Sequence, residues 1–471
     1  MATLTTDYLV VGAGATGMAF TDALLDASDA DVVLVDRQHE PGGHWLHAYP
    51  FVRLHQPSAY YGVGSTPLGG DRIDATGPNA GGYERADAPE ICAHYRRVLE
   101  DRLLGSGRVR FLGMSDYVRD RSNGHTVVSR LTGGATQVRV RRKLVDATYL
   151  EGEIPSRHAL PFDVGEGARV VPPNDLVERS AWDGSVDGYT VLGAGKTAMD
   201  VCNWLLGQGV PPESIRWVRP RDAWTYDREL LQPRELVASV IEGVAIEVEA
   251  AADAADVPEL FQRLEGGGRL LRLDPEVEPT MFRGATMSRG EVESLQRIDD
   301  VLRAGRVRRV ESDVLVMERG SVRARPGHLY VDCTAAGLSS RPPRRIFEPD
   351  RITVQTVRIG LTPFNAALVG HVEATHGVEA EKNRLCPPNV YPVTANDWLR
   401  TTYVSTAAER TWGDDPGLSA WLEATRLNLA SGLRAHLAEP RMQSAIARFL
   451  GNRDRALENL RRLLGAATPA A

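Results

Sequence analysis

The chain has 471 residues, 42% hydrophobic and 25% charged, which is the balance of a globular protein with two or three domains. Its net charge of −7 at pH 7 argues against a general binder of nucleic acid or of membrane surfaces. The four cysteines are scattered and form no CxxC pair, and the sequence predicts no signal peptide, membrane span or metal site, so we expect a reduced, cytoplasmic protein.

The N-terminal residues have the pattern of a strand–helix–strand unit. Residues 7–14, DYLVVGAG, predict a buried strand that enters a glycine turn, and residues 15–27 have the helical spacing of apolar side chains. Residues 31–36, DVVLVD, predict a second strand that ends at Asp36. This order of elements is that of a βαβ unit.

The turn in this unit has the GxGxxG spacing of a dinucleotide site. Gly12 permits a tight turn, Gly14 lets a pyrophosphate approach the backbone, and Gly17 lets helix and strand pack closely. Asp36 follows Gly12 by 24 residues and is expected to accept hydrogen bonds from a ribose 2′-hydroxyl, which suits FAD or NAD and repels a 2′-phosphate. The alternative is a glycine turn that binds no ligand.

The segment after this unit predicts a helix and then a small sheet. Residues 88–104 have an amphipathic helical pattern, and residues 109–142 contain short strand patterns separated by polar turns. We expect an antiparallel meander there, followed by a buried returning strand, KLVDAT, at residues 143–148.

A similar order recurs farther along the chain. Residues 188–195, GYTVLGAG, predict a strand and a glycine turn, residues 197–209 a helix, and residues 214–218 a second strand. A second meander is expected over residues 306–327, and LYVDCT at residues 329–334 resembles the earlier VDAT strand. The chain is therefore predicted to contain two related α/β modules.

The second glycine turn has GxGxxA spacing, formed by Gly193, Gly195 and Ala198. Its GKT sequence suggests a nucleotide-triphosphate loop, but that motif requires a glycine at the position of Thr190. The spacing therefore excludes the triphosphate loop and fits a dinucleotide turn.

The second unit ends in basic residues where the first ends in an acid. Arg219 and Arg221 follow its second strand, and guanidinium groups there would bind a 2′-phosphate, which favours NADPH over NADH. The alternative is a solvated basic corner. Two turns in one chain predict two cofactors, FAD in the first turn and the NADPH that reduces it in the second.

The remaining long apolar patterns are helical. Residues 247–264 predict a helix within the second module, and the C-terminal part predicts helices over residues 418–437, 442–450 and 455–464. Three roles are open for the C-terminal helices: they cap a substrate pocket, form the interface of a homodimer, or complete the core.

Residues 40–62, EPGGHWLHAYPFVRLHQPSAYYG, resemble the GGxW and YP segment of two-dinucleotide-domain flavoprotein monooxygenases, which comprise flavin-containing, Baeyer–Villiger and N-hydroxylating monooxygenases. The VDAT and VDCT strands are similar to the ATG-type strands of that family. The resemblance implies that the segment passes along the flavin ring, that Gly42 and Gly43 allow close backbone approach, and that Trp45 packs near the flavin. Arg53 matches the arginine of the family's YPGxR pattern.

The sequence also departs from the family pattern. The Baeyer–Villiger fingerprint is absent from residues 170–184, His55 replaces the acid that often follows the YPGxR arginine, and Tyr149 stands where the family usually has glycine. These departures leave the flavoprotein assignment intact and leave the oxygenation chemistry open.

The resemblance implies an α/β fold with two Rossmann-like dinucleotide-binding domains, an FAD domain with an inserted NADPH domain, and a helical C-terminal region. We place the FAD-binding domain at residues 1–165 and 326–395, the NAD(P)H-binding domain at residues 166–325, and the helical region at residues 396–471.

The candidate catalytic residues lie close to the predicted flavin segment. Arg53, His55 and His44 could each supply a hydrogen-bond donor to the reacting oxygen or steer NADP⁺, and the alternative for each histidine is a structural role. Residues 362–374 are expected to form a helix whose N-terminus points at the flavin, with Asn365 as a contact, and the alternative is a plain core helix.

The predicted cofactor-binding residues comprise both glycine turns, the strand ends and the GGHW segment. They are Gly12, Gly14, Gly17, Asp36, Arg37, Gly42, Gly43, His44, Trp45, Gln56, Thr148, Gly193, Gly195, Lys196, Thr197, Arg219, Arg221, Thr334 and Asn365. No metal ligands are predicted.

The sequence favours an FAD-dependent, NADPH-reduced monooxygenase that oxygenates a small or medium organic substrate with O2 through a C4a-(hydro)peroxyflavin. One alternative is an NADPH-dependent flavoprotein reductase or dehydrogenase that inserts no oxygen. Another is a dinucleotide-binding redox sensor whose helical C-terminus meets a protein partner. Oxygenation at carbon, nitrogen and sulfur are all open.

Overall fold

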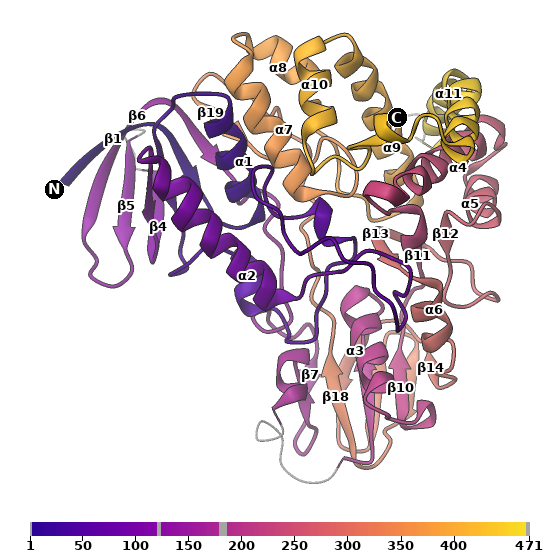
Figure 1. The fold of residues 1–471 in the computed structure, drawn as a ribbon. Helices are drawn as coiled ribbons and strands as arrows, with labels where there is room; N and C mark the ends of the chain where they lie inside the picture. The colour runs from indigo at the N-terminus through magenta and orange to yellow at the C-terminus, as the bar shows by residue number, and fades with distance from the viewer. Residues whose placement is uncertain (1, 120–123, 179–185, 468–471) are drawn as a thin grey trace.

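A seven-stranded sheet carries the first glycine turn (Figure 1). The structure is a computed structural model that describes residues 2–119, 124–178 and 186–467. The strands of this sheet are β1 (Ala2–Val11), β2 (Val32–Val35), β3 (Val109–Leu112), β4 (Ser115–Arg119), β5 (His125–Ser129), β6 (Ala135–Asp146) and β19 (Arg351–Thr353). Their order is β3-β2-β1-β6-β5-β4, and β19 pairs with β6. The pairs among β1, β2, β3, β6 and β19 are parallel, whereas β4 and β5 add antiparallel pairs.

The expected meander over residues 109–142 forms only in part. β4, β5 and β6 make antiparallel pairs, but β3 pairs in parallel with β2, where Val33 lies opposite Arg110. The chain leaves the parallel part of the sheet at Met114, which has a left-handed φ of 49°. In addition, the meander's last strand and the returning strand are one continuous strand, β6.

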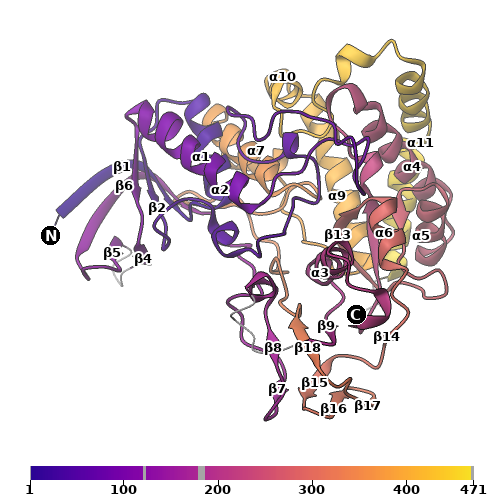
Figure 2. The ribbon, with the colours of Figure 1, turned by 60° about the horizontal axis from the view of Figure 1, so that its bottom comes forward.

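α1 (Ala15–Asp26) and α7 (Thr362–Thr375) lie side by side against this sheet (Figure 2). α7 confirms the helix predicted over residues 362–374. The two helices approach closely because Gly370 has no side chain, since a Cβ there would lie 2.5 Å from the carbonyl oxygen of Phe20. Phe20, Leu24 and Leu368 belong to the buried core of this part of the molecule.

α2 (Ala88–Arg97) confirms the first part of the helix predicted over residues 88–104. It begins with a capping box, in which the Asp87 side chain accepts from the Glu90 N–H and the Glu90 side chain accepts from the Asp87 N–H. The helix continues as a π-helical turn over Val98–Leu103.

A five-stranded parallel sheet carries the second glycine turn. Its strands are β8 (Val170–Val171), β9 (Gly188–Leu192), β10 (Ile215–Val218), β14 (Val301–Leu302) and β18 (His328–Asp332). Their order is β14-β10-β9-β18-β8, and α3 (Lys196–Gly207) and α6 (Arg289–Leu295) pack together beside it. The predicted second meander is confirmed as β15 (Val307–Val310), β16 (Val314–Met317) and β17 (Gly320–Arg323), with β7 (Asp163–Val164) added in parallel to β15.

A third, three-stranded sheet joins the second sheet to a helical layer on the right of Figure 1. Its strands are β11 (Ala223–Asp227), β12 (Leu270–Leu271) and β13 (Met281–Met287). The helices around it are α4 (Ala238–Asp253), α5 (Val257–Gly266), α9 (Ala395–Gly413) and α11 (Pro440–Ala467), and one buried cluster, which includes Phe261, Phe282 and Trp398, joins the sheet to them. Two further helices, α8 (Glu379–Leu385) and α10 (Pro416–Ala424), pack on α9 and belong to the core of the first sheet.

Two of the predicted helices end earlier than expected. The helix predicted over residues 247–264 is two helices, because Asp256 accepts from the Glu259 N–H and caps a new helix start. The helix predicted over residues 418–437 ends at Ala424, where the Asn428 side-chain amide donates to the carbonyl of Leu422 at 2.7 Å.

The two C-terminal helices predicted over residues 442–450 and 455–464 are one helix, α11. Gly451 lies in its middle, although glycine costs about 1 kcal/mol in a helix. Packing against α4 along most of the helix outweighs this cost, because helices in proteins gain most of their stability from tertiary contacts.

The predicted fold class, α/β with Rossmann-like sheets and a helical C-terminal region, is confirmed. The domain boundaries near residues 165, 325 and 395 stay predictions. None of the helices in the described part of the chain has the length and apolarity that a membrane span requires.

Candidate active site

Both glycine turns open onto one cavity of about 1910 Å³. Its walls come from the β1–α1 turn, the GGHW segment, the β9–α3 turn and the helical layer. Ligand pockets of drug-like size are roughly 300–1,000 Å³, so this cavity has room for more than one small molecule.

The first turn has the backbone of a dinucleotide turn. Gly12 has a φ of 102°, and its N–H donates to the carbonyl of Val35, the last residue of β2, at 2.8 Å. A Cβ on Gly17 would lie 1.8 Å from the carbonyl oxygen of Gly12. Gly12 and Gly14 line the cavity, whereas Gly17 allows α1 to pack on the turn.

The paired glycines of the GGHW segment lie against this turn. The Gly42 N–H donates to the carbonyl of Ala13 at 3.0 Å, and Gly42 has a φ of 138°. A Cβ on Gly43 would lie 3.0 Å from the Cα of Gly14. The two glycine motifs, nearly 30 residues apart in the chain, therefore form one backbone surface at the cavity.

Asp36 lies at the cavity edge, as predicted, but its carboxylate is also used by the fold. Oδ2 accepts from the Ala13 N–H at 2.6 Å, and Oδ1 accepts from the Gln38 N–H at 2.7 Å. Because a carboxylate can accept about four hydrogen bonds, capacity for a ribose hydroxyl remains. Arg37 also lines the cavity and forms an exposed ion pair with Glu151 at 3.1 Å.

The second turn repeats this backbone. Gly193 has a φ of 128°, and its N–H donates to the carbonyl of Val218, the last residue of β10, at 3.0 Å. A Cβ on Gly193 would lie 2.4 Å from the carbonyl oxygen of Cys333. Neither α1 nor α3 has a side-chain N-cap, so both helices present free N–H groups and a positive dipole end, the features that bind phosphates.

The VDAT and VDCT strands each end in a turn of the same kind, which explains their similarity in sequence. The N–H and hydroxyl of Thr148 both donate to Asp146 Oδ1, and the N–H and hydroxyl of Thr334 both donate to Asp332 Oδ1. Both threonines line the cavity, beside the first and second glycine turns respectively.

Arg219, a predicted phosphate ligand, does not line the cavity. Its Nε lies 2.7 Å from Asp222 Oδ1, and its guanidinium lies 5.0 Å from the centre of the Trp217 ring. Its side chain is 5% exposed, and burial lowers its pKa. The charge of Arg219 is thus compensated inside the fold, and the structure assigns it to an ion pair that holds the end of β10.

Arg221, two residues on, does line the cavity. Burial lowers its pKa, and so do the charges of Arg306 and Arg283. Arg221 forms no ion pair with any described residue, and Arg306 and Arg308 line the same wall. Sequence reasoning missed these last two arginines, because they come from the second meander, more than 80 residues farther along the chain.

Trp45 and His44 have different surroundings. Trp45 Nε1 donates to the Tyr61 hydroxyl at 2.7 Å, and the two rings meet edge to face. His44 projects into the cavity, and its removal from bulk water lowers its pKa to about 4. His44 is therefore neutral at pH 7.

His55 and Gln56 line the cavity above a buried ion pair. Arg228 Nε donates to the carbonyl of His55 at 2.7 Å, and Arg228 Nη2 lies 2.7 Å from Glu291 Oε2. Burial lowers the pKa of His55 well below its usual range, and the charges of Lys196 and Arg228 lower it further. His55 is therefore also neutral at pH 7.

Arg53, a predicted catalytic residue, points away from the cavity. It is exposed, and its Nη1 donates to the carbonyl of Arg85 at 2.8 Å. Its neighbours Val52 and Leu54 are buried and line the cavity, so the extended backbone turns Arg53 to the opposite face.

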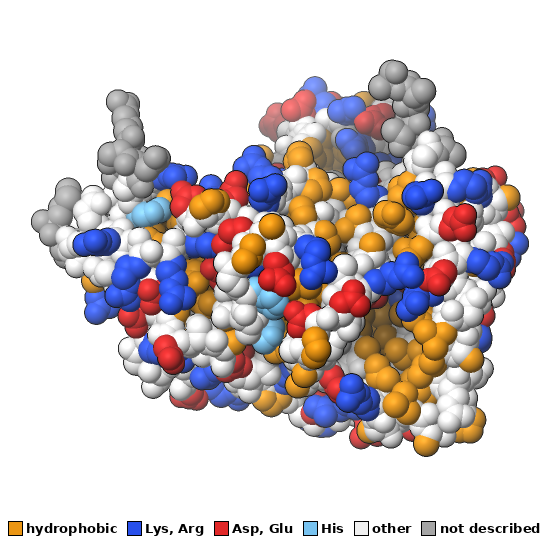
Figure 3. Space-filling view, turned by 90° about the horizontal axis from the view of Figure 1, so that it is seen from above, with side chains coloured by type: hydrophobic (Ala, Val, Ile, Leu, Met, Phe, Trp, Pro, Cys, Tyr) orange, Lys and Arg blue, Asp and Glu red, His pale blue; other side chains and the backbone are white. Residues whose placement is uncertain are grey.

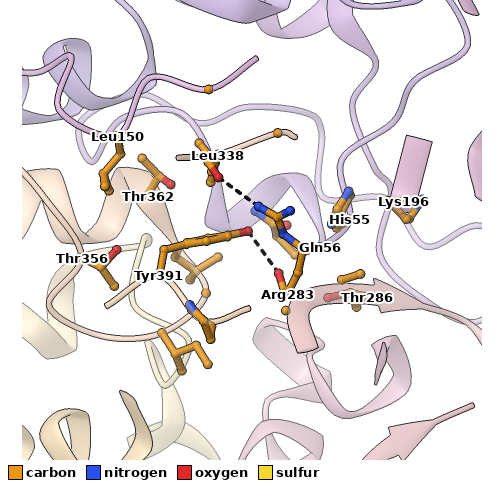
Figure 4. A pocket seen from close by; sticks show the side chains of 18 of the residues that line it. His55, Gln56, Leu150, Lys196, Arg283, Thr286, Leu338, Thr356, Thr362 and Tyr391 are labelled. Carbon is orange, nitrogen blue, oxygen red and sulfur yellow. Dashed lines mark hydrogen bonds between the residues drawn. The ribbon is translucent and has the colours of Figure 1, made fainter. Parts of the chain in front are cut away.

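Asn365 lines the cavity, but its side chain is used by the loop before α7. Its Oδ1 accepts from the N–H groups of Val357 and Arg358, and its Nδ2 donates to the carbonyls of Arg358 and Leu361. The structure thus gives Asn365 a loop-shaping role. Thr362, the first residue of α7, points into the cavity (Figure 4).

Lys196 lies where the two modules meet. Its ammonium pairs with Asp200 one turn along α3, and the Tyr49 hydroxyl donates to Asp200 Oδ2 at 2.8 Å. Tyr49 belongs to the GGHW segment, so this contact joins that segment to α3. Thr197 follows Lys196 and also lines the cavity.

Arg283 and Tyr391 form the opposite side of this junction (Figure 4). Arg283 Nη2 donates to the carbonyl of Leu338 at 3.0 Å, and the Tyr391 hydroxyl donates to the carbonyl of Arg283 at 3.1 Å. Sequence reasoning missed both residues, because no local motif marks them and the fold brings them together from distant segments.

The chain matches known proteins at two levels. The NAD(P)-binding Rossmann-like domain family matches residues 10–56, which contain the first glycine turn and the GGHW segment. The uncharacterized protein Rv2000 of Mycobacterium tuberculosis is 45% identical over 469 residues, which cover 99% of this chain and 86% of that protein.

Two solved structures share the fold at low sequence identity. The polycyclic ketone monooxygenase of Thermothelomyces thermophila has a TM-score of 0.53 and 14% identity, over 96% of this chain and 90% of that chain. The cyclohexanone monooxygenase of Rhodococcus sp. Phi1, bound to NADP⁺, has a TM-score of 0.50 and 15% identity, over 93% of this chain and 98% of that chain. The chain therefore belongs to the family of the mycobacterial protein Rv2000 and has the fold of two-dinucleotide-domain flavoprotein monooxygenases.

Proposed function

We propose that this protein is an FAD-dependent oxidoreductase, reduced by NADPH, that oxygenates an organic substrate with O2. The observation that carries the proposal is the meeting of two uncapped, glycine-started helices at one cavity. Asp36 marks the end of the cavity beside the first turn, and Arg221 marks the end beside the second. One cavity can thus hold two dinucleotides with their redox rings in contact.

The first turn fits FAD. The N–H groups at the start of α1 would hold the pyrophosphate, the Asp36 carboxylate would accept from the adenosine ribose, and Gly43 leaves room for close approach. Trp45, fixed by Tyr61, would pack near the ring system. When bound, FAD supplies the ring that takes electrons from a nicotinamide and passes them to O2.

The second turn fits NADPH. The N–H groups at the start of α3 would hold the pyrophosphate, and Arg221 with Arg306 would bind the 2′-phosphate. Arg221 suits this role because it forms no ion pair in the described part of the chain, while the like charges of Arg306 and Arg283 outweigh the effect of the nearby Glu318. NADP⁺ in the cyclohexanone monooxygenase with this fold supports the same cofactor here.

The junction between the turns suits a reaction that excludes water. Lys196 is held by Asp200, and Asp200 is held by Tyr49, so the ammonium has a fixed position at the cavity wall. Arg283 is likewise fixed by Leu338. We infer that Lys196 and Arg283 orient the nicotinamide cofactor and the substrate, while apolar walls keep water out.

Three measurements on the purified protein test the proposal. The protein should be yellow, release FAD on denaturation, and oxidise NADPH faster than NADH. In the presence of substrate, the hydrogen peroxide formed should be well below the NADPH consumed, because oxygen goes into product. A colourless protein that takes up no added FAD would contradict the proposal.

The main alternative is an NADPH-dependent reductase that inserts no oxygen. It is favoured by the outward position of Arg53, which removes one of the hydrogen-bond donors that the sequence suggested, whereas the neutral His44 and His55 each keep one N–H donor. For this alternative, hydrogen peroxide would equal the NADPH consumed with every substrate. The redox sensor, the homodimer and the cytoplasmic location stay predictions of the sequence.

A further inference from the structure

One arm of the cavity extends between helices α4, α9 and α11, outside both glycine turns. Its apolar lining comes mostly from one face of α4 and one face of α11. The lining residues of α4 are Val240, Ile241, Val244, Glu247, Val248 and Ala251, and those of α11 are Ile446, Phe449, Leu450, Arg453, Ala456, Leu457 and Leu460.

The spacing of these residues defines two continuous stripes. On both helices the lining positions recur every three or four residues, which places them on one helical face. On α11 the stripe runs from Ile446 to Leu460, a rise of roughly 21 Å at 1.5 Å per residue. The stripe on α11 is therefore long enough to follow an extended chain.

The two helices form a fixed wall. α4 and α11 run parallel, and bidentate ion pairs join Arg441 to Glu242 and Arg448 to Glu249 along their other edge. Arg455 pairs with Asp253 farther along the same edge. The charged edge holds the pair together. The lower parts of the stripes, such as Val248, Ala251 and Leu460, also belong to the buried core, and the stripe on α11 is most open at Ile446, Phe449 and Leu450.

Part of this apolar surface has no protein cover. Ile446 and Phe449 are only half-buried although they face the interior, and Leu450 is 58% exposed. The half of the molecule that carries α4 and α11 has a hollow with hydrophobic side chains around it (Figure 3). Uncovered apolar surface of this kind marks a binding site more often than a solvent face.

The third wall of the arm, α9, is mostly polar. Its lining residues lie on one helical face and are Thr402, Ser405, Thr406, Glu409 and Trp412. Glu409 lies 3.5 Å from Arg358 Nη1, and Arg358 Nε and Nη2 have no hydrogen-bond partner among the described residues. Burial lowers the pKa of Arg358. A ligand in the arm would therefore meet mainly hydrocarbon on two sides, apart from Glu247 and Arg453, and hydrogen-bonding groups on the third.

The geometry points to an elongated, amphipathic substrate with a long-chain hydrocarbon body. The body lies along the stripes of α4 and α11, and its oxygen-bearing end lies towards Arg358 and the junction at Tyr391. This inference rests on the proposed function and narrows its substrate from a small or medium organic molecule to a long-chain one. A compact substrate would leave most of the stripe on α11 without contact.

A homologous series of ketones, from 2-hexanone to 2-hexadecanone, tests the inference on the full-length, FAD-loaded protein. Affinity is measured without turnover, by displacement of the neutral apolar dye N-phenyl-1-naphthylamine. We expect the affinity to rise about fourfold with each methylene that the arm buries. The rise should level off once the chain is longer than the arm.

In variants that fill the arm, the affinity should stop rising at a shorter ketone chain. Ile446→Trp narrows the stripe on α11, and Val244→Phe narrows the stripe on α4, so either change should remove the gain for the longest ketones. Leu131→Trp is the matched control, because Leu131 is 74% exposed in the turn between β5 and β6. The FAD content of each sample reports whether the variant is folded. If Ile446→Trp does not fold, Val244→Phe provides the test.

The outcomes separate this inference from the proposed function. Two results would overturn the inference of a long-chain substrate, even if the protein binds FAD and oxidises NADPH. One is an affinity for ketones that does not depend on chain length. The other is a dependence on chain length that is the same in Ile446→Trp, Val244→Phe and Leu131→Trp. Conversely, a chain-length profile that the filled variants shorten would support the arm even if no oxygen were inserted into product.

Discussion

The two glycine turns share a backbone and differ in what surrounds it. Gly12 and Gly193 both have a positive φ, and both donate to the last residue of the neighbouring strand. The third small residue of the motif differs between the two turns. Gly17 has no space for a Cβ, whereas Ala198 carries a Cβ and is fully buried. The first turn is thus the tighter of the two.

The strand ends differ in a second way, through the use of their charges. The Asp36 carboxylate closes its own turn and still faces the cavity. In the second unit these tasks are divided, because Arg219 pairs with Asp222 inside the fold, whereas Arg221 lines the cavity beside Arg306 and Arg308. A charge at the end of a strand is therefore available to a ligand only if the fold has not already paired it.

Gly17→Ala should have the largest effect, because the new Cβ would overlap the carbonyl oxygen of Gly12. We expect about 3 kcal/mol or more of lost stability and loss of bound FAD. Ala198→Gly, the reverse change in the second turn, should cost about 1 kcal/mol and keep FAD bound. Thermal unfolding and the flavin content of the purified proteins check both variants, and equal losses would show that the two turns are equally tight.

Arg219→Ala should mainly reduce stability. It leaves the buried Asp222 with Arg303 as its remaining partner, so we expect a loss of about 2–3 kcal/mol in the free energy of unfolding. The preference for NADPH over NADH should not change. Urea unfolding measures the stability, and the Kd values for NADPH and NADH measure the preference. If the preference is lost and the stability is unchanged, Arg219 binds the 2′-phosphate after all.

Arg221→Ala should have the opposite profile. We expect the Kd for NADPH to rise by about tenfold to a hundredfold, as expected for one lost charge-assisted phosphate contact, with NADH binding and stability unchanged. Titration of each cofactor checks this result. If both cofactors weaken equally, Arg221 does not distinguish the 2′-phosphate.

A pH series gives the smallest effect near neutral pH and concerns the first turn. The His44 side chain is exposed within the cavity, and its separation from bulk water there lowers its pKa to about 4, whereas an unfolded histidine titrates near 6.5. Below about pH 6.5 the unfolded chain therefore binds a proton that the folded protein does not, and stability falls as the pH falls towards 4. His44→Gln should make this slope shallower by up to one proton in urea unfolding, and an unchanged slope would mean that His44 is solvated.

Local patterns predicted the parts of the fold that depend on local forces. The glycine turns, α1, α3 and α7 follow from spacing within short segments. The pairing of β3 with β2 and the continuity of α11 through Gly451 were not predicted, because each depends on a partner distant in sequence. The end of α10 at Ala424 was missed for a different reason, because the local contact of the Asn428 side chain with the Leu422 carbonyl leaves no mark in the apolar spacing.

The candidate site divides in the same way. The glycines and Asp36 were found because a motif fixes their geometry, and Arg306, Arg283 and Arg358 were missed because only the tertiary fold brings them to the cavity. The outward position of Arg53 had a signal in the sequence, since Val52 and Leu54 on either side are apolar and strand-like alternation sends the middle residue to the other face.

The central claim is that both turns deliver their cofactors to one cavity. Anaerobic rapid mixing of the purified protein with NADPH tests this claim most directly, with NADPH deuterated at the transferred position of C4 as the second arm. The account predicts rapid bleaching of the flavin absorbance and a slower rate with deuterated NADPH. If bound FAD is present but NADPH does not bleach it, the two sites do not meet and the account is contradicted.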